Sequence, residues 1–415
     1  MRAGNRAREF TACLLVLAAA LMSCSRTEAP PLGVYRVVVS TEGGDLPFGL
    51  ELAREDGKPV AYLINGPERA RSSDVQLEGN QLSVKIAGYQ NRIEATYQDG
   101  RFEGTLFILR PRGVVKEFRL VAMPDEGWRF FPKPVAEPMD FSGRWALTYR
   151  DDDGKESMAI AELKQEGYVV TGTVLRTSGD DRYIAGEARG DTLFLSRFDG
   201  GSAYLYLARL RNDGVLSGDQ YTAGGSHDTF TGRRDPNAKL DAKANPTALK
   251  PGVDHLVFSF PDIEGKLHDF PDERYDGKVV LITIGGSWCP NCHDEAAFLK
   301  ELLASRQARG LEVIQLMFER TEDFASSAKA AGDFAKEFAI PYPVLIAGSV
   351  TDGNVLEKLP QLEGFHGYPS MFVIDRKGVV RAVHTGFSGP ATGEHYEEQN
   401  RELTALVDKL LDESA

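Results

Sequence analysis

Cysteine is scarce in this chain, and the scarcity limits the disulfide chemistry that is open to it. The 415 residues include four cysteines. Cys13 and Cys24 belong to an N-terminal segment with the features of an export signal, so Cys289 and Cys292 are the cysteines expected to remain as thiols in the mature protein. A bridge between residues so close in sequence closes almost no loop and stabilises little. A structural disulfide is therefore the weaker explanation for the pair, and a reactive dithiol is the stronger one.

Positive charge and long apolar runs are also in short supply. Lys and Arg number 48 against 61 Asp and Glu, which gives a formal net charge of -13. Such a surface repels nucleic acid and anionic lipid, and this argues against either as the main partner. No apolar run after the N-terminal segment is long enough to span a membrane. The length exceeds one ordinary hydrophobic core, so we expect two or three domains.

The first residues have the pattern of a secretory signal. Arg2, Arg6 and Arg8 supply a positive start, and residues 10–22 are apolar but too few for a comfortable membrane span. We expect residues 1–23 to be a signal peptide that is removed on maturation.

The end of that signal carries a further pattern. The run Leu21-Met22-Ser23-Cys24 resembles the lipobox of bacterial lipoproteins. The resemblance implies that Cys24 becomes a lipidated N-terminus, with residues 24–32 as a tether, and that the protein faces the periplasm from the bacterial cell envelope. Ser25, in place of an aspartate, implies the outer membrane. Ordinary secretion with a chance cysteine at this place is the alternative.

The residues after the tether predict β structure. Short alternating runs are separated by Gly, Asp and Asn turns, and no long helical pattern interrupts them. The runs include residues 34–40, 81–86, 192–196 and 203–208.

This part of the chain contains two copies of one β-rich sequence unit. The matching pieces are Gly33-Val-Tyr-Arg-Val with Gly143-Arg-Trp-Ala-Leu, Gly79-Asn-Gln-Leu82 with Gly190-Asp-Thr-Leu193, and Asp99-Gly100 with Asp213-Gly214. We therefore predict a duplicated all-β, barrel-like region, with repeats at residues 33–122 and 142–235 and a proline-rich linker at 123–141. An up-and-down meander that closes would remove exposed strand edges. Apolar residues such as Tyr35 and Trp145 are expected in the cores, and we assign no functional site here.

The composition changes after a second linker at residues 236–252. Strand patterns at residues 279–284, 311–318, 343–346 and 370–374 alternate with helical patterns at 294–309, 322–338 and 394–411. This alternation predicts an α/β domain over residues 253–415.

The cysteine pair follows the first of these strands. The run Trp288-Cys-Pro-Asn-Cys292 places both thiols where a helix begins, and the unpaired amides and dipole of a helix N-terminus stabilise a thiolate. Cys289 is therefore the predicted nucleophile. Cys292 lies one turn further on and could attack the mixed disulfide as the resolving thiol. Together they would form a redox-active disulfide.

Residues 249–415 resemble the TlpA/ResA-like membrane-tethered thiol-disulfide oxidoreductases of thioredoxin fold. The resemblance rests on an apolar strand before Trp288-Cys-x-x-Cys292, on Glu295, and on Gly367-Tyr-Pro-Ser-Met-Phe-Val-Ile-Asp375 downstream. It implies that Pro369 is cis and lies against the cysteines, and that the backbone of Tyr368 binds a substrate strand. Trp288 is expected to shape and shield the redox surface rather than to take part in the chemistry.

The same resemblance implies a role for Glu295 in tuning the resolving thiol and assisting proton transfer. Its spacing from Cys292 puts both residues on one helical face. An acid in the first helical turn is also favourable for dipole reasons alone, so this role has a simpler alternative.

Other functions are less well supported by the sequence. Cys289-x-x-Cys292-His293 is also the attachment motif of c-type haem, but it follows an apolar strand in an α/β pattern, and His293 is expected on the helix surface. The histidines show no paired spacing, so no metal site is expected. Peroxiredoxin-like peroxidase activity ranks below dithiol exchange. The β repeats could instead bind a ligand or partner, with the redox domain as an accessory.

The sequence thus predicts an enzyme that exchanges a dithiol and a disulfide with exported proteins and needs no cofactor. Its partners would be exported proteins bearing thiols or disulfides and an unidentified redox donor or acceptor. The direction of electron flow is open, with reduction of the partner preferred.

Overall fold

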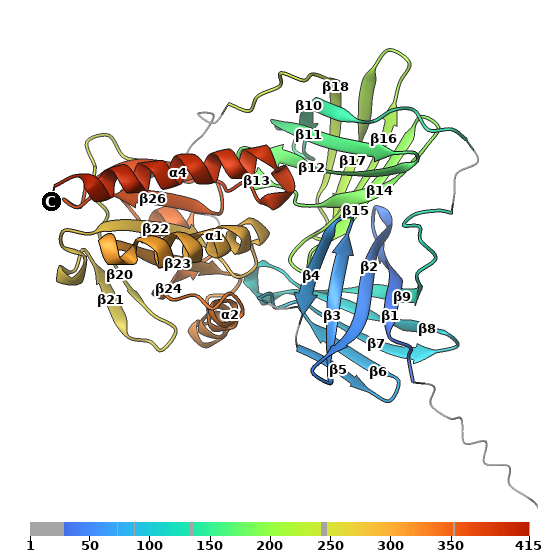
Figure 1. Ribbon diagram of the computed structural model, residues 1–415, viewed down its shortest axis with the longest axis horizontal. Coiled ribbons are helices and arrows are strands. Elements are labelled where there is room, and N and C mark those ends of the chain that lie inside the picture. The colour runs from blue at the N-terminus through green and yellow to red at the C-terminus, as the bar shows by residue number, and fades with distance from the viewer. Residues whose placement is uncertain are drawn as a thin grey trace, which may run out of the picture.

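Two nine-stranded sheets and one five-stranded sheet make up the body of the protein in a computed structural model (Figure 1). The structure describes residues 29–72, 74–86, 88–132, 136–241, 247–351 and 353–414. The predicted signal peptide and the lipidation site Cys24 lie outside the described residues. None of the helices in the described part of the chain combines the length and apolar character needed to cross a bilayer. A barrel-like all-β region followed by an α/β domain is the predicted fold class, and it is confirmed.

The first nine-stranded sheet is an up-and-down meander. Its strands are β1 (Gly33–Thr41), β2 (Gly44–Glu55), β3 (Lys58–Asn65), β4 (Glu68–Ser72), β5 (Asp74–Glu78), β6 (Gln81–Lys85), β7 (Arg92–Gln98), β8 (Arg101–Leu109) and β9 (Val115–Pro124), with a 3-10 turn at Pro111–Gly113. They lie in the order β4-β3-β2-β1-β9-β8-β7-β6-β5. In β1, Tyr35, Val37 and Val39 are buried while their neighbours are more exposed. This alternation places one face of the strand on a core.

The second nine-stranded sheet repeats this plan and closes. Its strands are β10 (Gly143–Arg150), β11 (Glu156–Glu166), β12 (Val169–Arg176), β13 (Gly179–Asp180), β14 (Ile184–Arg189), β15 (Thr192–Phe198), β16 (Ala203–Leu210), β17 (Val215–Thr222) and β18 (His227–Arg234). They lie in the order β11-β10-β18-β17-β16-β15-β14-β12-β13, and an additional pairing of β11 with β12 completes a barrel. The first and last strands pair in both sheets, β1 with β9 and β10 with β18.

Matching glycines occupy matching places in the two sheets. Gly79, between β5 and β6, and Gly190, between β14 and β15, have φ angles of 60° and 57°, a left-handed conformation that favours glycine. A Cβ atom on Gly104 of β8 or Gly218 of β17 would lie 2.0 or 2.4 Å from a carbonyl oxygen of the neighbouring strand. The glycines of the repeated sequence pattern are therefore required by the same turns and the same close strand contacts.

The two sheets share buried contacts. The rings of Phe48 and Phe198, one from each sheet, lie 4.9 Å apart. Arg129, from the segment between the sheets, donates to Asn65 Oδ1 and to Ser196 Oγ, each at 2.9 Å. The connecting segment is thus part of the packing between the sheets.

The C-terminal part is an α/β domain, coloured from yellow to red in Figure 1. Its elements are β19 (Ala248–Leu249), β20 (Phe258–Pro261), β21 (Leu267–Phe270), β22 (Val279–Gly285), α1 (Pro290–Arg306), β23 (Leu311–Glu319), α2 (Phe324–Glu337), β24 (Val344–Ser349), α3 (Asn354–Lys358), β25 (Leu362–Gly364), β26 (Ser370–Ile374), β27 (Val380–Thr385) and α4 (Glu394–Asp412), with 3-10 turns at Glu273–Tyr275, Gln307–Arg309 and Pro390–Thr392.

The five-stranded sheet of this domain has the order β24-β23-β22-β26-β27. Strand β22 runs parallel to β23 and antiparallel to β26. Every residue of β22 is buried, because α1, α2 and α4 cover one face of the sheet and the β20–β21 hairpin and α3 cover the other. The cysteine pair follows this central strand, after a short loop.

A core residue of the second sheet tests the packing of the barrel. Trp145 is 1% exposed, and its Nε1–H donates to Phe141 O at 2.9 Å. We expect Trp145→Ala to lower the free energy of unfolding of this sheet by about 3–5 kcal/mol, because it leaves a large cavity. Hydrogen exchange of the β10–β18 amides in increasing urea would measure the loss. Trp128→Ala, at a partly exposed site, is the control and should cost far less, and equal losses would contradict this account.

Candidate redox site at the start of α1

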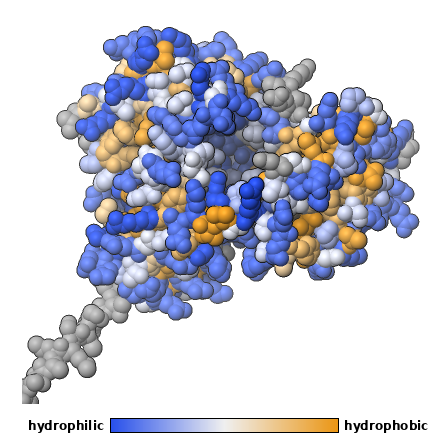
Figure 2. Space-filling model, turned by 180° about the vertical axis from the view of Figure 1, so that it is seen from behind, coloured by the Kyte–Doolittle hydropathy of each residue, from blue (hydrophilic) through white to orange (hydrophobic). Residues whose placement is uncertain are grey.

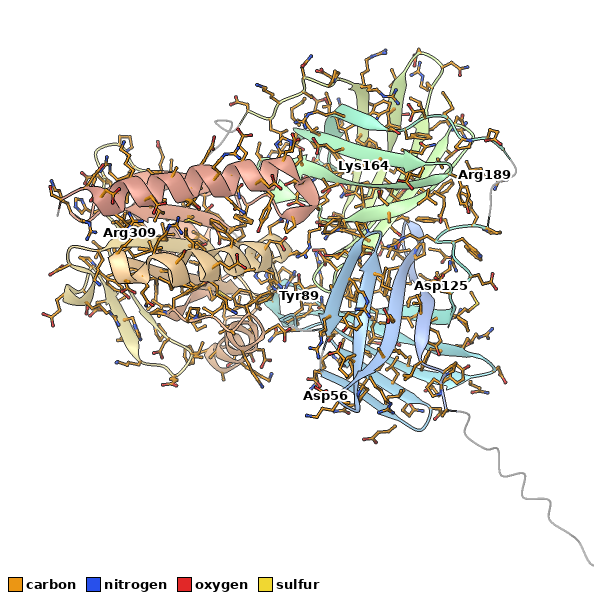
Figure 3. The ribbon with its side chains drawn as sticks, viewed as in Figure 1. Asp56, Tyr89, Asp125, Lys164, Arg189 and Arg309 are labelled. Atoms are coloured by element: carbon orange, nitrogen blue, oxygen red, sulfur yellow. A yellow bond between two sulfur atoms is a disulfide. The ribbon has the colours of Figure 1, made fainter. Side chains whose placement is uncertain are left out.

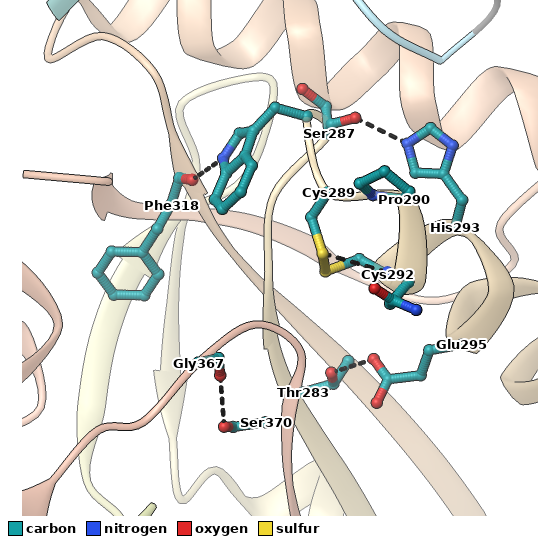
Figure 4. Close-up of a disulfide and its surroundings, with 12 residues drawn as sticks. Thr283, Ser287, Cys289, Pro290, Cys292, His293, Glu295, Phe318, Gly367 and Ser370 are labelled. Carbon is teal, nitrogen blue, oxygen red and sulfur yellow. Dashed lines mark hydrogen bonds between the residues drawn. A yellow bond between two sulfur atoms is a disulfide. The ribbon is translucent and has the colours of Figure 1, made fainter. Parts of the chain in front are cut away.

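The two cysteines form a disulfide at the first turn of α1 (Figure 4). Their Cα atoms lie 5.2 Å apart. Cys289 is the N-cap residue of the helix, and its Sγ accepts a hydrogen bond from Cys292 N at 3.2 Å. Pro290 occupies the first helical position, where no amide hydrogen is needed. The sulfur of Cys289 therefore lies at the positive end of the helix dipole, where a thiolate would be stabilised.

The loop between β22 and the cysteines is held by a buried acid. Ser287 donates to Glu319 twice, from N to Oε1 at 2.9 Å and from Oγ to Oε2 at 2.8 Å. Burial raises the pKa of Glu319 to about 7. Glu319 was not among the residues predicted from the sequence, although an acid directly after the apolar run Leu316-Met-Phe318 of a buried strand was a usable signal.

Trp288 and Tyr368 form the aromatic border of the site. Trp288 Nε1 donates to Phe318 O at 2.8 Å, and the Trp288 and Tyr368 rings meet edge to face at 5.1 Å. The peptide bond between Tyr368 and Pro369 is cis, as the resemblance implied. Pro369 is buried, and its loop faces the disulfide (Figure 4). The structure thus gathers these sequence-predicted residues around Cys289.

Glu295 lies one turn beyond Cys292, inside the domain. It is 1% exposed, and its Oε2 accepts a hydrogen bond from Thr283 Oγ1 at 2.5 Å. Burial raises the pKa of Glu295 to about 8, and the Thr283 hydrogen bond opposes this rise. The carboxyl group is therefore mostly protonated at neutral pH.

The expected surface position of His293 is wrong. His293 is 5% exposed, and its ring stacks on Tyr89 of the first sheet at 4.1 Å between centroids. Figure 3 shows Tyr89 at the boundary between the sheets and the C-terminal domain. The Nε2 atom bonds to Ser287 O at 2.7 Å, and burial lowers the pKa of His293 to about 3. This packing arises between segments distant in sequence, so helical spacing could not reveal it.

The arrangement of His293 also bears on the haem alternative. A c-type haem needs an imidazole nitrogen free to bind iron and both cysteines free for thioether bonds. Here the neutral ring donates from Nε2 to a backbone carbonyl and packs against the aromatic rings of Tyr89, Phe334 and Phe338. The residues present therefore do not fit haem attachment.

The β sheets supply contacts to the cysteine loop that the sequence analysis missed. Asp180 Oδ1 accepts from Asn291 Nδ2 at 2.8 Å, and Arg182 Nη1 donates to Pro290 O at 3.2 Å. Arg182 Nη2 also lies 2.8 Å from Glu68 Oε1 and 3.4 Å from Asp294 Oδ1. This guanidinium joins carboxylates of the first sheet and of the C-terminal domain. No spacing rule brings these residues together, because the contacts exist only after the domains pack.

The C-terminal region is similar in sequence to known proteins. Residues 253–383 match the model of the AhpC/TSA family. The chain is 26% identical over 140 residues to the thiol-disulfide oxidoreductase ResA of Geobacillus thermodenitrificans, covering 34% of this chain and 72% of the relative. It is 30% identical over 144 residues to the thiol:disulfide interchange protein DsbE of Escherichia coli K12, covering 35% of this chain and 66% of the relative.

Two solved structures match a similar part of the chain. A thiol:disulfide interchange protein of the thioredoxin family from Chlorobium tepidum is 20% identical with a TM-score of 0.29, and the match covers 42% of this chain and 99% of that one. A secreted Mycobacterium tuberculosis disulfide oxidoreductase is 18% identical with a TM-score of 0.28, covering 37% and 96%. The C-terminal region of the protein is a thioredoxin-like domain, similar in sequence to thiol-disulfide oxidoreductases.

Proposed function

We propose that the protein is an exported, lipid-anchored thiol-disulfide oxidoreductase that exchanges its Cys289–Cys292 dithiol and disulfide with other exported proteins. The observation that carries this proposal is the disulfide at the N-terminus of α1, with Cys289 as the N-cap residue beside the Tyr368–Pro369 loop. A thiolate at this position is both stabilised and placed to react. The signal pattern of residues 1–23 and the lipobox-like run ending at Cys24 support export and anchoring in the cell envelope.

In the reducing direction, the reaction has two exchange steps. The Cys289 thiolate attacks one sulfur of the partner disulfide, and the other partner sulfur leaves as a thiolate. Cys292 then loses its proton and attacks Cys289 Sγ, which releases the second partner thiol and closes the internal disulfide. Two electrons have moved to the partner, and a donor dithiol must restore the reduced pair. The reverse sequence would donate a disulfide.

Glu295 is the proposed proton acceptor for Cys292. It lies one helical turn from Cys292, inside the domain, and its raised pKa of about 8 suits exchange of a proton with a thiol. Trp288 and the Tyr368 backbone are proposed to border the bound substrate, since both line the cavity at Cys289.

The two cysteines can be distinguished by trapping. We expect Cys292→Ser to accumulate mixed disulfides with envelope proteins, because the bond to Cys289 can form but not resolve. Cys289→Ser should accumulate none. Non-reducing gels of cells treated with acid and alkylating reagent would measure both. Equal trapping by the two variants would contradict the assigned roles, and rapid oxidation of Cys289 by hydrogen peroxide with no trapped protein would favour the peroxidase alternative.

The pH dependence of resolution tests Glu295. We expect Glu295→Gln to slow the release of a trapped model thiol by about 100-fold, a typical contribution of a proton acceptor, and to remove the rise in rate as the pH passes about 8. The matched control is Thr283→Val, which keeps the acid but removes the hydrogen bond that stabilises its charged form. That variant should shift the rise to higher pH. Stopped-flow measurements between pH 6 and pH 10 would follow it.

The stability of Glu295→Gln shows whether its effect on the rate comes from a local change of charge or from loss of the fold. The folded pKa of Glu295 lies above the unfolded value of 4.5, so its contribution to stability is fully present below about pH 4.5 and is lost as the pH rises through 8. Glu295→Gln should therefore gain stability relative to the wild type as the pH rises over this range. An unchanged pH profile of the resolution rate in this variant would contradict the proposed role.

A further inference from the structure

A cavity of about 390 Å³ lies between the disulfide and one end of the second sheet. The C-terminal domain contributes Trp288, Cys289 and Tyr368 to its wall. The second sheet contributes mainly polar residues from β12, β13, β15, β16, β17 and β18 and from the turns beside them. Seen from behind, the surface between the sheets and the C-terminal domain is hollowed, and hydrophilic residues surround the hollow (Figure 2). The volume lies within the usual range for a small-ligand site, about 300–1,000 Å³.

The turn between β12 and β13 restricts other approaches to Cys289. Thr177 Oγ1 lies 2.9 Å from His366 Nε2, and a Cβ atom on Gly367 would lie 2.9 Å from Ser178 Cβ. This turn therefore packs directly on the loop that precedes Pro369. Cys289 itself is only 3% exposed. While the β12–β13 turn packs on the loop before Pro369, a broad folded surface could not reach this sulfur. A short peptide chain that enters the cavity could reach it.

An unsatisfied donor on the cavity wall indicates the chemistry of an occupant. Arg197 is 2% exposed, its Nη1 bonds to Asp199 Oδ2, and its Nε–H has no partner among the described residues. Burying such a donor unpaired is costly, so an acceptor oxygen is expected there. The neighbouring Arg176 is already bonded to Asp181 at 3.1 Å and to Gln220 at 2.7 Å. Among the described residues of the cavity wall, Arg197 is therefore the cation with a buried N–H donor that has no partner.

The acids on the wall differ in their availability. Asp180 accepts from Arg182 N at 2.7 Å as well as from Asn291, and Asp181 accepts from Arg176 and Tyr206, so both are engaged. Asp228, on β18, also lines the cavity, and its carboxylate accepts no hydrogen bond from the described part of the chain. A ligand with a carboxylate for Arg197 and an N–H group for Asp228 has the two functional groups of a short peptide.

We propose that this cavity binds a short, extended cysteine-containing peptide that carries a carboxylate near its cysteine, and that Arg197 selects for that carboxylate. The inference rests on the proposed disulfide exchange at Cys289. The peptide could be a free acidic tripeptide thiol of the glutathione type or a flexible acidic segment of an exported protein. Both present the same chemistry to the cavity.

The reaction of the reduced protein with oxidised glutathione gives a direct test. Cys289 attacks one sulfur and displaces one glutathione thiolate, and Cys292 then displaces the second, so two thiols form and the protein disulfide closes. The matched probe is the fully esterified glutathione disulfide, which keeps the shape but lacks the carboxylate charge. We expect the ratio of the two oxidation rate constants, acid over ester, to be about tenfold higher in the wild type than in Arg197→Lys. Each variant serves as its own reference, so intrinsic thiol reactivity cancels.

The variants are chosen to change the Arg197 donor without leaving Asp199 as an unpaired buried charge. Arg197→Lys preserves the charge that compensates Asp199 but removes the Nε–H donor of the guanidinium. If it fails to fold, the double variant Arg197→Met/Asp199→Asn removes both buried charges together. Arg209→Lys is the control, because Arg209 lies on β16 with its side chain 65% exposed and outside the cavity. It should keep the wild-type ratio.

The outcomes separate this inference from the proposed function. An equal ratio in the wild type and in folded Arg197→Lys would overturn the selection of a carboxylate while leaving disulfide exchange intact. If the reduced protein reacts with none of the three disulfides (the glutathione disulfide, its ester and dithiothreitol disulfide), the proposed function is overturned instead. Longer unfolded peptides with glutamate or glutamine beside the cysteine distinguish the sources. A preference for glutamate only in the long peptides indicates a protein segment, and a preference in the tripeptide as well indicates a free thiol.

Discussion

The first turn of α1 carries both the disulfide and the contacts that hold the C-terminal domain against the β sheets. Pro290, Asn291 and His293 lie between or beside the two cysteines, and each touches a residue from residues 33–235. The reactive group therefore cannot be described as the property of an isolated thioredoxin-like domain. Its exposure, its entrance and part of its electrostatic environment come from the sheets.

The carboxyl groups around the disulfide share one electrostatic property. Burial raises the pKa of Glu295 to about 8 and those of Glu319 and Asp294 to about 7. At neutral pH these groups are largely or partly protonated, so they add less negative charge beside a Cys289 thiolate than exposed acids would. The positive end of α1 can then stabilise the thiolate with less opposition. These groups become charged as the pH rises from about 7 through about 8, and their negative charge then opposes the Cys289 thiolate.

The features that the sequence could predict are those with short-range signals. Alternating burial in β1, the paired glycine turns and the cysteine run at the start of a helix all follow from local spacing. The position of His293 and the role of Arg182 do not, because each depends on packing between residues more than a hundred positions apart. In an isolated helix, the histidine of Cys-x-x-Cys-His would be exposed. In the folded protein, Tyr89 packs on His293 and buries it. Domain interfaces were therefore the part of the site that local patterns could not show.

The central claim is that Cys289 and Cys292 form a working redox couple rather than a structural bridge. Its most direct test is the redox equilibrium of the protein without its signal and anchor segments, measured against glutathione or dithiothreitol by alkylation of Cys289. The account predicts a reversible two-electron couple, and the measured potential would also give the preferred direction of exchange. A pair that stays oxidised or reduced across the whole range of buffers, or that changes only with loss of the fold, would contradict it.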